Sequence, residues 1–137
     1  MCVPLPPERG LVLAGVLGWS MGGLGGLLLG SMLADSGNER PVLAISPALW
    51  PAYDQAMATA YDTRQQYDDA MRRARAQLAR ETRIDCGTAD PFYRDVRTVL
   101  EGIDVEQHYE RGGHDEAYWT RELPGQLDWL AERVSTG

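Results

Sequence analysis

Short apolar runs alternate with longer stretches of helical character along this chain. Residues 11–17 and 42–46 are almost continuously apolar, which predicts two strands buried on both faces of a sheet. Residues 82–86 and 105–109 predict two more strands, and the alternating polar positions of the last one indicate the sheet edge. Helical character marks the remaining stretches, which are residues 22–32, 53–80 with a break near 61–64, 92–100 and 116–134.

The order of these elements predicts an α/β fold. Strands that alternate with helices form parallel sheets with right-handed crossovers, so we expect about four parallel strands with flanking helices. We expect residues 11–137 to form the core of a single domain, after an irregular, proline-containing lead-in at residues 1–10. In the terminal helix, Pro124 predicts a kink and an apolar stripe predicts the buried face. That stripe consists of Trp119, Leu123, Leu127 and Leu130.

The composition narrows the possible functions. An apolar share of 44% is typical of a globular protein, and a net charge of −7 gives no electrostatic reason to bind nucleic acid or an anionic membrane. Every basic residue is an arginine, which excludes a Schiff-base lysine. The two cysteines, Cys2 and Cys86, lack a metal-ligand spacing, and Cys86 is interpreted as a free thiol in a strand. Two histidines without a third strong ligand give no metal site, and no cofactor is expected.

The apolar start of the chain has a second interpretation as a membrane segment. No charged residue occurs between Leu11 and Leu33, and that length could cross a bilayer. Glycines recur throughout this stretch, however, and they interrupt a helix repeatedly. A buried strand followed directly by a buried helix explains the same run, and we favour that interpretation.

The strongest chemical signal is G-W-S-M-G at residues 18–22, which matches the G-x-S-x-G nucleophile elbow. Ser20 is expected on a sharp turn between strand and helix, where glycines at 18 and 22 avoid a clash. The amides at the start of the helix would face developing negative charge, with the backbone N–H of Met21 as one oxyanion donor. The alternative is a glycine-rich segment for helix packing, but the apolar strand before the motif and the apolar helix after it favour the elbow.

A serine nucleophile needs a general base, and the chain has two histidines. His108 lies inside the last predicted strand, whereas His114 follows that strand in R-G-G-H-D. Catalytic groups of open α/β sheets lie beyond the carboxyl ends of strands. His114 is therefore predicted as the base, and His108 as an ordinary strand residue.

The base needs an orienting carboxylate, which in this arrangement comes between serine and histidine along the chain. Asp90 occupies the loop after the third predicted strand and is the preferred acid. Asp85 lies on the strand itself and remains the alternative, either as the acid or as a structural carboxylate. Asp115 is predicted to cap the terminal helix.

These segments resemble the esterase family of α/β hydrolases that contains esterase D (S-formylglutathione hydrolase), feruloyl esterases and the antigen 85 mycolyltransferases. The resemblance rests on G-W-S-M-G-G at 18–23, I-S-P-A at 45–48, D-C-G-T-A-D-P-F at 85–92 and G-G-H-D-E-A-Y-W at 112–119. It implies a serine esterase that cleaves a small-molecule ester through a Ser-Asp-His triad and an acyl-enzyme. The antigen 85 relatives use Glu as the acid, so Asp90 favours ester hydrolysis over mycolyl transfer.

The same resemblance implies a partial domain over residues 1–137. Members of that family carry a long N-terminal half before the elbow, with the first strands and the second oxyanion donor, whereas only ten residues precede the elbow strand here. The chain is thus expected to correspond to the C-terminal half, with weak or no activity alone. Two alternatives stay open, which are an inactive remnant or interaction module and a small membrane-anchored protein.

Two residue groups outside the triad have an interpretation for packing and one for binding. The arginines among residues 72–83 are interpreted as a solvated helix face, because acidic residues interleave with them, rather than as an anion site. Those arginines are Arg72, Arg73, Arg75, Arg80 and Arg83. Trp50, Tyr53 and Tyr61 either line an acyl pocket or pack within the core.

Overall fold

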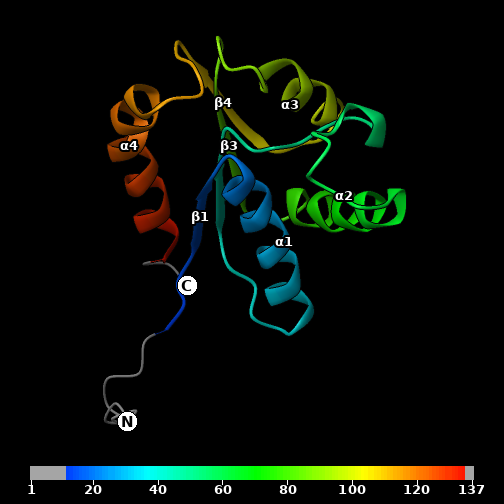
Figure 1. Cartoon of the computed structure of the whole chain (residues 1–137). Helices are drawn as coiled ribbons and strands as arrows, with labels where there is room; N and C mark the ends of the chain where they lie inside the picture. The colour runs from blue at the N-terminus through cyan, green and yellow to red at the C-terminus, as the bar shows by residue number, and fades with distance from the viewer. Residues whose placement is uncertain (1–11, 135–137) are drawn as a thin grey trace, which may run out of the picture.

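The structure, a computed structural model, describes residues 12–134 and contains one parallel sheet with helices on both faces (Figure 1). The strands lie in the order β1-β2-β3-β4, each parallel to its neighbour, which confirms the predicted α/β fold. Along the chain the elements are β1 (Val16–Trp19), α1 (Met21–Asp35), β2 (Val42–Ile45), the 3-10 helix η2 (Tyr53–Gln55), α2 (Arg64–Leu78), β3 (Thr82–Gly87), α3 (Tyr93–Val99), β4 (Glu106–Glu110) and α4 (Glu116–Val134).

The first strand starts later than the apolar run predicts. Pairing with β2 extends only from Val16, opposite Val42, to Trp19, opposite Ile45. Val12 precedes the paired segment and is 77% exposed, while Leu11 lies outside the described residues. The predicted strand at 11–17 therefore begins too early and ends too early. A strand extends only as far as its hydrogen-bonded partner, and β2 pairs with β1 at four positions. The sharp turn predicted around Ser20 consists of that residue alone, since β1 ends at Trp19 and α1 begins at Met21.

The break predicted near residues 61–64 is confirmed. The break is longer than predicted, however, because residues 56–63 are not helical, and the helix predicted before the break is reduced to η2. The hydroxyl of Thr63 caps α2 by accepting the backbone N–H of Gln66 at 3.2 Å. Strand β4 lies at the edge of the sheet, as its alternating pattern predicts.

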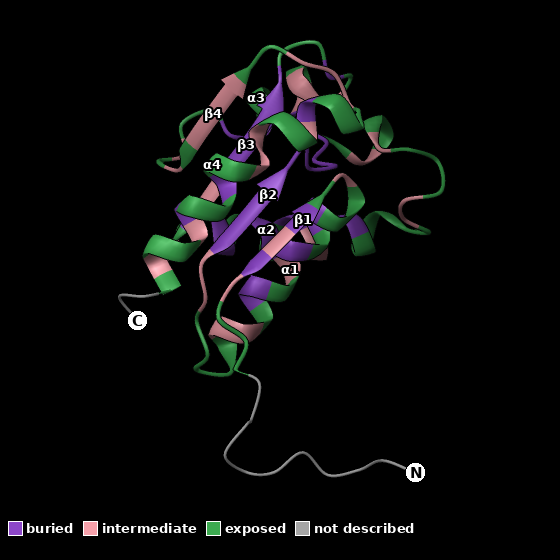
Figure 2. Cartoon of the chain, turned by 90° about the vertical axis from the view of Figure 1, so that its left-hand side faces the viewer, coloured by how far each residue is buried: buried purple, intermediate pink, exposed green. Residues whose placement is uncertain are grey.

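The sheet separates two apolar clusters of different size. The larger cluster packs α1, α2 and α3 against one face, through residues such as Leu27, Met71 and Ile84. The smaller cluster lies on the other face, where Leu43 and Ile45 of β2 meet α4. Figure 2 shows β2 and β3 buried at the centre and β4 more exposed.

The buried face of α4 agrees only in part with the predicted apolar stripe, since Trp119 and Leu130 pack against the smaller cluster but Leu127 does not. The helix runs through Pro124 as one element and buries Tyr118, Gln126 and Trp129. Leu127, which the stripe placed inside, is 50% exposed. Because the sheet under α4 includes the polar side chain of Asp85, a glutamine rather than a leucine faces it. Hydrophobicity alone could not reveal this pairing.

The uncharged stretch from Leu11 to Leu33 has the arrangement of a strand, a turn and a helix over its described part. Within residues 12–134, no helix has both the length and the apolar character needed to cross a bilayer.

Candidate active site

The G-W-S-M-G motif forms a sharp turn between β1 and α1. Ser20 has φ 57° and ψ −123°, a conformation that side-chain-bearing residues rarely adopt. Its backbone N–H donates to Ile45 O at 2.9 Å, and its carbonyl accepts from Gly23 and Ala48 at 2.9 and 3.1 Å. The turn is therefore held by β2 and by the loop that follows it.

The two glycines of the motif are not equivalent. A Cβ on Gly18 would lie 2.0 Å from the carbonyl oxygen of Gly22, so no larger residue fits at position 18. A Cβ on Gly22 would meet no atom within 4 Å. The expectation that both positions need glycine is therefore wrong for Gly22. A side chain at position 18 would clash with the backbone carbonyl of residue 22, whichever residue stands there, whereas a side chain at position 22 would point into open space.

The structure brings the three predicted triad side chains together from three separate loops. His114 Nε2 lies 2.8 Å from Ser20 Oγ, and His114 Nδ1 lies 2.9 Å from Asp90 Oδ2. A carboxylate can only accept, so the imidazole proton belongs on Nδ1 and leaves Nε2 to accept from the serine hydroxyl. The second carboxylate oxygen of Asp90 accepts the N–H of Phe92 at 2.8 Å, which fixes the orientation of the carboxylate.

Ser20 and His114 are partly buried, whereas Asp90 is more deeply buried. The Asp90 side chain is fully buried, and the His114 side chain is 25% exposed. Two aromatic rings contact the imidazole edge-on, Phe92 at a centroid distance of 4.8 Å and Trp119 at 5.2 Å. Trp119 is itself held by a hydrogen bond from its Nε1 to the buried Ser46 Oγ at 3.2 Å. The imidazole is thus confined on two sides.

The loops that carry Asp90 and His114 pack directly on each other. A Cβ on Gly87 would lie 2.2 Å from Gly112 O, so the end of β3 and the histidine loop touch through backbone atoms. Ala89 N also donates to Gly112 O at 2.8 Å. Asp115 caps α4 as predicted, because its Oδ1 accepts the N–H of Tyr118 at 3.0 Å. The backbone on both sides of His114 is therefore fixed.

The alternative base and acid have other partners. His108 lies on β4, where its Nε2 is 3.4 Å from Glu106. Asp85 pairs with Arg83 at 2.6 Å and accepts from Gln126 at 2.8 Å. Asp85 therefore has the structural role considered for it, and Arg83 is a 12% exposed partner of a buried carboxylate instead of part of a solvated helix face.

Two groups near the triad complete its surroundings. Met21 is the first residue of α1, and N–H groups of a first helical turn have no acceptor within their helix, so its amide is available to an oxyanion. The buried thiol of Cys86 on β3 is free, as predicted, and burial, together with the charge of Asp90, raises its pKa to about 12. This thiol stays neutral beside the aspartate. Cys2 lies outside the described residues.

The aromatic residues proposed for a pocket have mixed roles. Trp50 is 3% exposed and packs edge-on against Tyr61 and Phe92, so it supports the loop that carries Asp90 from inside the core. Sequence reasoning did not predict an open apolar cleft of about 300 Å³ between Trp19 and Leu123, which Trp119 also lines. These side chains come from β1 and α4, which are far apart in sequence, so no local sequence pattern predicts the cleft.

Comparison with known proteins gives a structural match alone. No family model matches the chain, and no curated protein matches its sequence. Among solved structures, a ferulic acid esterase matches with a TM-score of 0.57 and 21% identity, over 88% of this chain and 52% of that chain. The chain thus spans about half the length of that structure. At this identity the match establishes a shared α/β fold of the kind found in an esterase.

Proposed function

We propose that this chain is a serine esterase of the α/β-hydrolase type, with Ser20 as nucleophile, His114 as base and Asp90 as orienting acid. The observation that carries the proposal is the continuous chain of contacts from Ser20 Oγ through the imidazole to Asp90, at 2.8 and 2.9 Å. The likeness to a ferulic acid esterase supports the same reaction class. A small carboxylic ester is the proposed substrate.

The proposed reaction has two halves. Ser20 Oγ attacks the carbonyl carbon while its proton moves to His114 Nε2, and the carbonyl electron pair moves onto oxygen. The Met21 N–H stabilises that oxyanion. Collapse of the tetrahedral intermediate breaks the ester C–O bond, and the leaving alkoxide takes the proton from Nε2. Water then attacks the acyl-serine by the same proton route, which releases the acid and restores the serine. Asp90 holds the Nδ1–H tautomer and stabilises the imidazolium throughout.

We also propose that residues 1–137 correspond to the C-terminal part of such a domain. The matched ferulic acid esterase has roughly as much chain outside the aligned region as within it, since only 52% of it is covered. A second oxyanion donor would come from a segment equivalent to that uncovered region, so we expect slow turnover by this chain.

Covalent labelling with a fluorophosphonate tests the proposal more sensitively than turnover does. We expect the purified chain to label, and the label to disappear in Ser20→Ala and His114→Ala. The matched controls are Ser36→Ala, which changes an exposed serine at the end of α1, and His108→Ala, which changes the other histidine of the chain. Both controls should label at the rate of the unmodified chain. Labelling that persists in Ser20→Ala, or a folded chain that never labels, would contradict the proposal, and the second result would favour an inactive remnant.

A further inference from the structure

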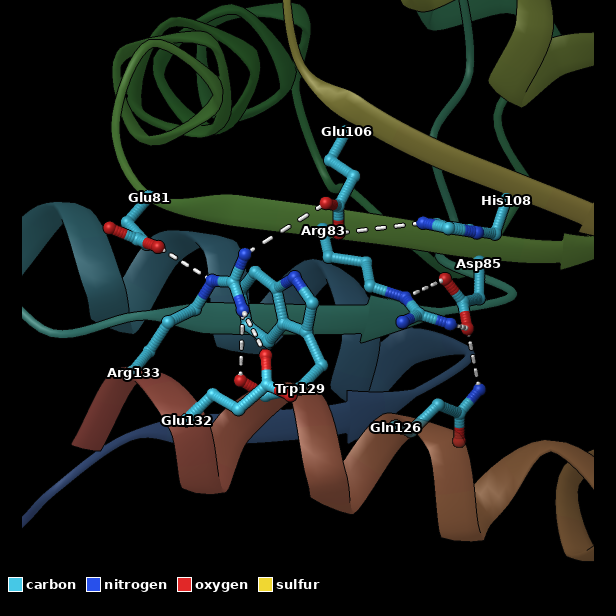
Figure 3. A network of polar contacts seen from close by, with 9 residues as sticks. All are labelled: Glu81, Arg83, Asp85, Glu106, His108, Gln126, Trp129, Glu132 and Arg133. Carbon is cyan, nitrogen blue, oxygen red and sulfur yellow. Dashed lines mark hydrogen bonds and ion pairs between the residues drawn. The ribbon is translucent and has the colours of Figure 1, made fainter. Parts of the chain in front are cut away.

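The proposed mechanism leaves one buried carboxylate unused. The Asp85 side chain is 2% exposed, and both of its oxygens are engaged by Arg83 of the same strand, at 2.6 and 2.8 Å. Gln126 reaches from α4 to Asp85 Oδ2 at 2.8 Å, as Figure 3 shows. This cluster is a polar contact between β3 and α4 in the interior of the protein.

The cluster lies at the centre of the contact between α4 and the sheet. Alternate residues of a strand face the same side, so Arg83 and Asp85 share a face, while Ile84 contributes to the larger cluster on the opposite face. On the α4 side, the small apolar cluster lies mainly over β2, at Leu43 and Ile45. Over β3, α4 is held by the hydrogen bond of Gln126 near its middle and, at its C-terminal end, by the ion pair of Arg133 with Glu81 at 2.6 Å.

This hydrogen bond adds little to the free energy of folding. Gln126 is fully buried, and its Oε1 has no hydrogen-bond partner among the described residues. An unpaired buried carbonyl costs free energy, and replacing both partners of a buried polar contact by apolar residues of similar shape is often nearly neutral in stability. What the glutamine adds over such a residue is direction, because its N–H fixes one distance between α4 and β3.

The contact between Gln126 and Asp85 completes a closed circuit of contacts that includes the segment carrying His114. On one side of the histidine, Gly112 rests on Gly87 of β3, and a Cβ on Gly112 would lie 2.6 Å from the ring of Tyr118. On the other side, α4 runs from Tyr118 to Gln126, which returns to β3 at Asp85. His114 lies in the part of this circuit between Gly112 and Tyr118. A shift of α4 along β3 would therefore move the imidazole relative to Ser20.

We propose that Gln126 and Asp85 are positioning residues, which fix α4 on β3 and thereby hold His114 in reach of Ser20. This inference rests on the proposed function, in that the position of His114 matters for proton transfer from Ser20. It extends that function to a contact on the far side of the sheet from α1, α2 and α3.

The test replaces Gln126 with methionine, which has a similar shape but no N–H donor. Asp85 keeps both hydrogen bonds from Arg83, so we expect Tm to change by only a few degrees. Fluorophosphonate labelling should become roughly 10-fold slower or more, because a displacement of about 1 Å at the reacting atoms can cost 100-fold. The control is Ala74→Gly, a buried site of α2 on the opposite face of the sheet, which lowers stability without touching α4.

A second readout separates this inference from the proposed function. In the chain labelled with 15N at histidine, the ring nitrogens of His114 should report one tautomer, protonated on Nδ1, in the unmodified chain and in Ala74→Gly. Gln126→Met should shift these signals toward a mixture of tautomers. If the unmodified chain does not label at all, the proposed function fails, and this spectrum alone decides the positioning role. Unchanged His114 signals in Gln126→Met, or labelling at the original rate, would overturn the inference.

Discussion

The inequality of the two motif glycines makes a sharp prediction, since the same chemical change can be made at both. In Gly18→Ala, the new Cβ would lie 2.0 Å from the carbonyl oxygen of Gly22 and 2.6 Å from its carbonyl carbon. Both atoms belong to backbone, so no side-chain rotation can relieve the contact. In Gly22→Ala, the new methyl would enter open space.

The size of the effect follows from the displacement that the clash requires. Carbon and oxygen atoms in contact lie about 3.3 Å apart, so relief needs a movement of about 1.3 Å between β1 and the first turn of α1. Ser20 lies between these two segments, and a shift of about 1 Å at the reacting atoms can slow a reaction about 100-fold. Overpacking of this kind also costs about 1–3 kcal/mol of folding free energy. Gly22→Ala should instead stabilise α1 by about 0.5–1 kcal/mol, because alanine loses less conformational entropy than glycine in a helix.

The assay is the second-order rate constant for fluorophosphonate labelling, with Tm measured on the same samples. We expect Gly18→Ala to label about 100-fold more slowly and to melt at a lower temperature. Gly22→Ala should label at a rate within about threefold of that of the unmodified chain, which corresponds to a difference of under about 0.7 kcal/mol in activation free energy. Its melting temperature should be slightly higher. Equal damage from both variants, or normal labelling by Gly18→Ala, would refute the reasoning from backbone contact.

Three further predictions concern the surroundings of the triad. Asp90→Asn should keep the fold but favour the wrong imidazole tautomer, so that labelling falls roughly 10⁴-fold, and a loss below about 10-fold would exclude Asp90 as the acid. In a Cys2→Ser background, Cys86 should not react with a disulfide reagent at pH 8 until urea unfolds the chain, because burial raises the pKa of its thiol to about 12. Since the folded thiol holds its proton more tightly than the unfolded one, the free energy of unfolding should fall as pH rises from about 9 toward 12, which denaturant titrations across that range can measure. Trp119→Phe and Ser46→Ala should each destabilise the chain by about 1 kcal/mol, and the double variant should lose little more if one hydrogen bond accounts for both effects.

The sequence predicted the layout of the sheet, and it selected the three side chains that the structure brings together, because both depend on local patterns. Apolar runs identified the strands, and punctuation by glycine and proline separated them from the helices. Ser20 was recognisable from its motif, and His114 from its place after a strand while His108 lay within one. Asp115 could be predicted as a cap because capping involves only residues close in sequence. Each of these predictions uses information within about ten residues of the feature.

Contacts between distant segments were not predictable in the same way. Hydrophobicity placed Leu127 on the buried face of α4, whereas the structure buries Gln126. The reason is Asp85, which is far from Gln126 in sequence and lies under α4 only once β3 has been placed in the sheet. Arg83 was grouped with the arginines of a helix for the same reason. An arginine and an aspartate two residues apart on one strand do share a face, and that spacing was the available signal.

The geometry of the triad also depends on an arrangement that strand order alone does not provide. Neighbouring strands are about 4.8 Å apart, so β1 and β4, at opposite edges of this sheet, are separated by about 14 Å. Ser20 and His114 follow these two strands, yet their side chains are 2.8 Å apart. The histidine loop must therefore run back across the ends of β3 and β2, and it can do so only if its backbone lies flat on them. Gly87 and Gly112 allow that contact, since a Cβ on either one would collide with the other segment or with Tyr118. These two glycines, rather than the elbow alone, allow His114 to come within hydrogen-bond distance of Ser20, and the position of α4 determines where the loop ends.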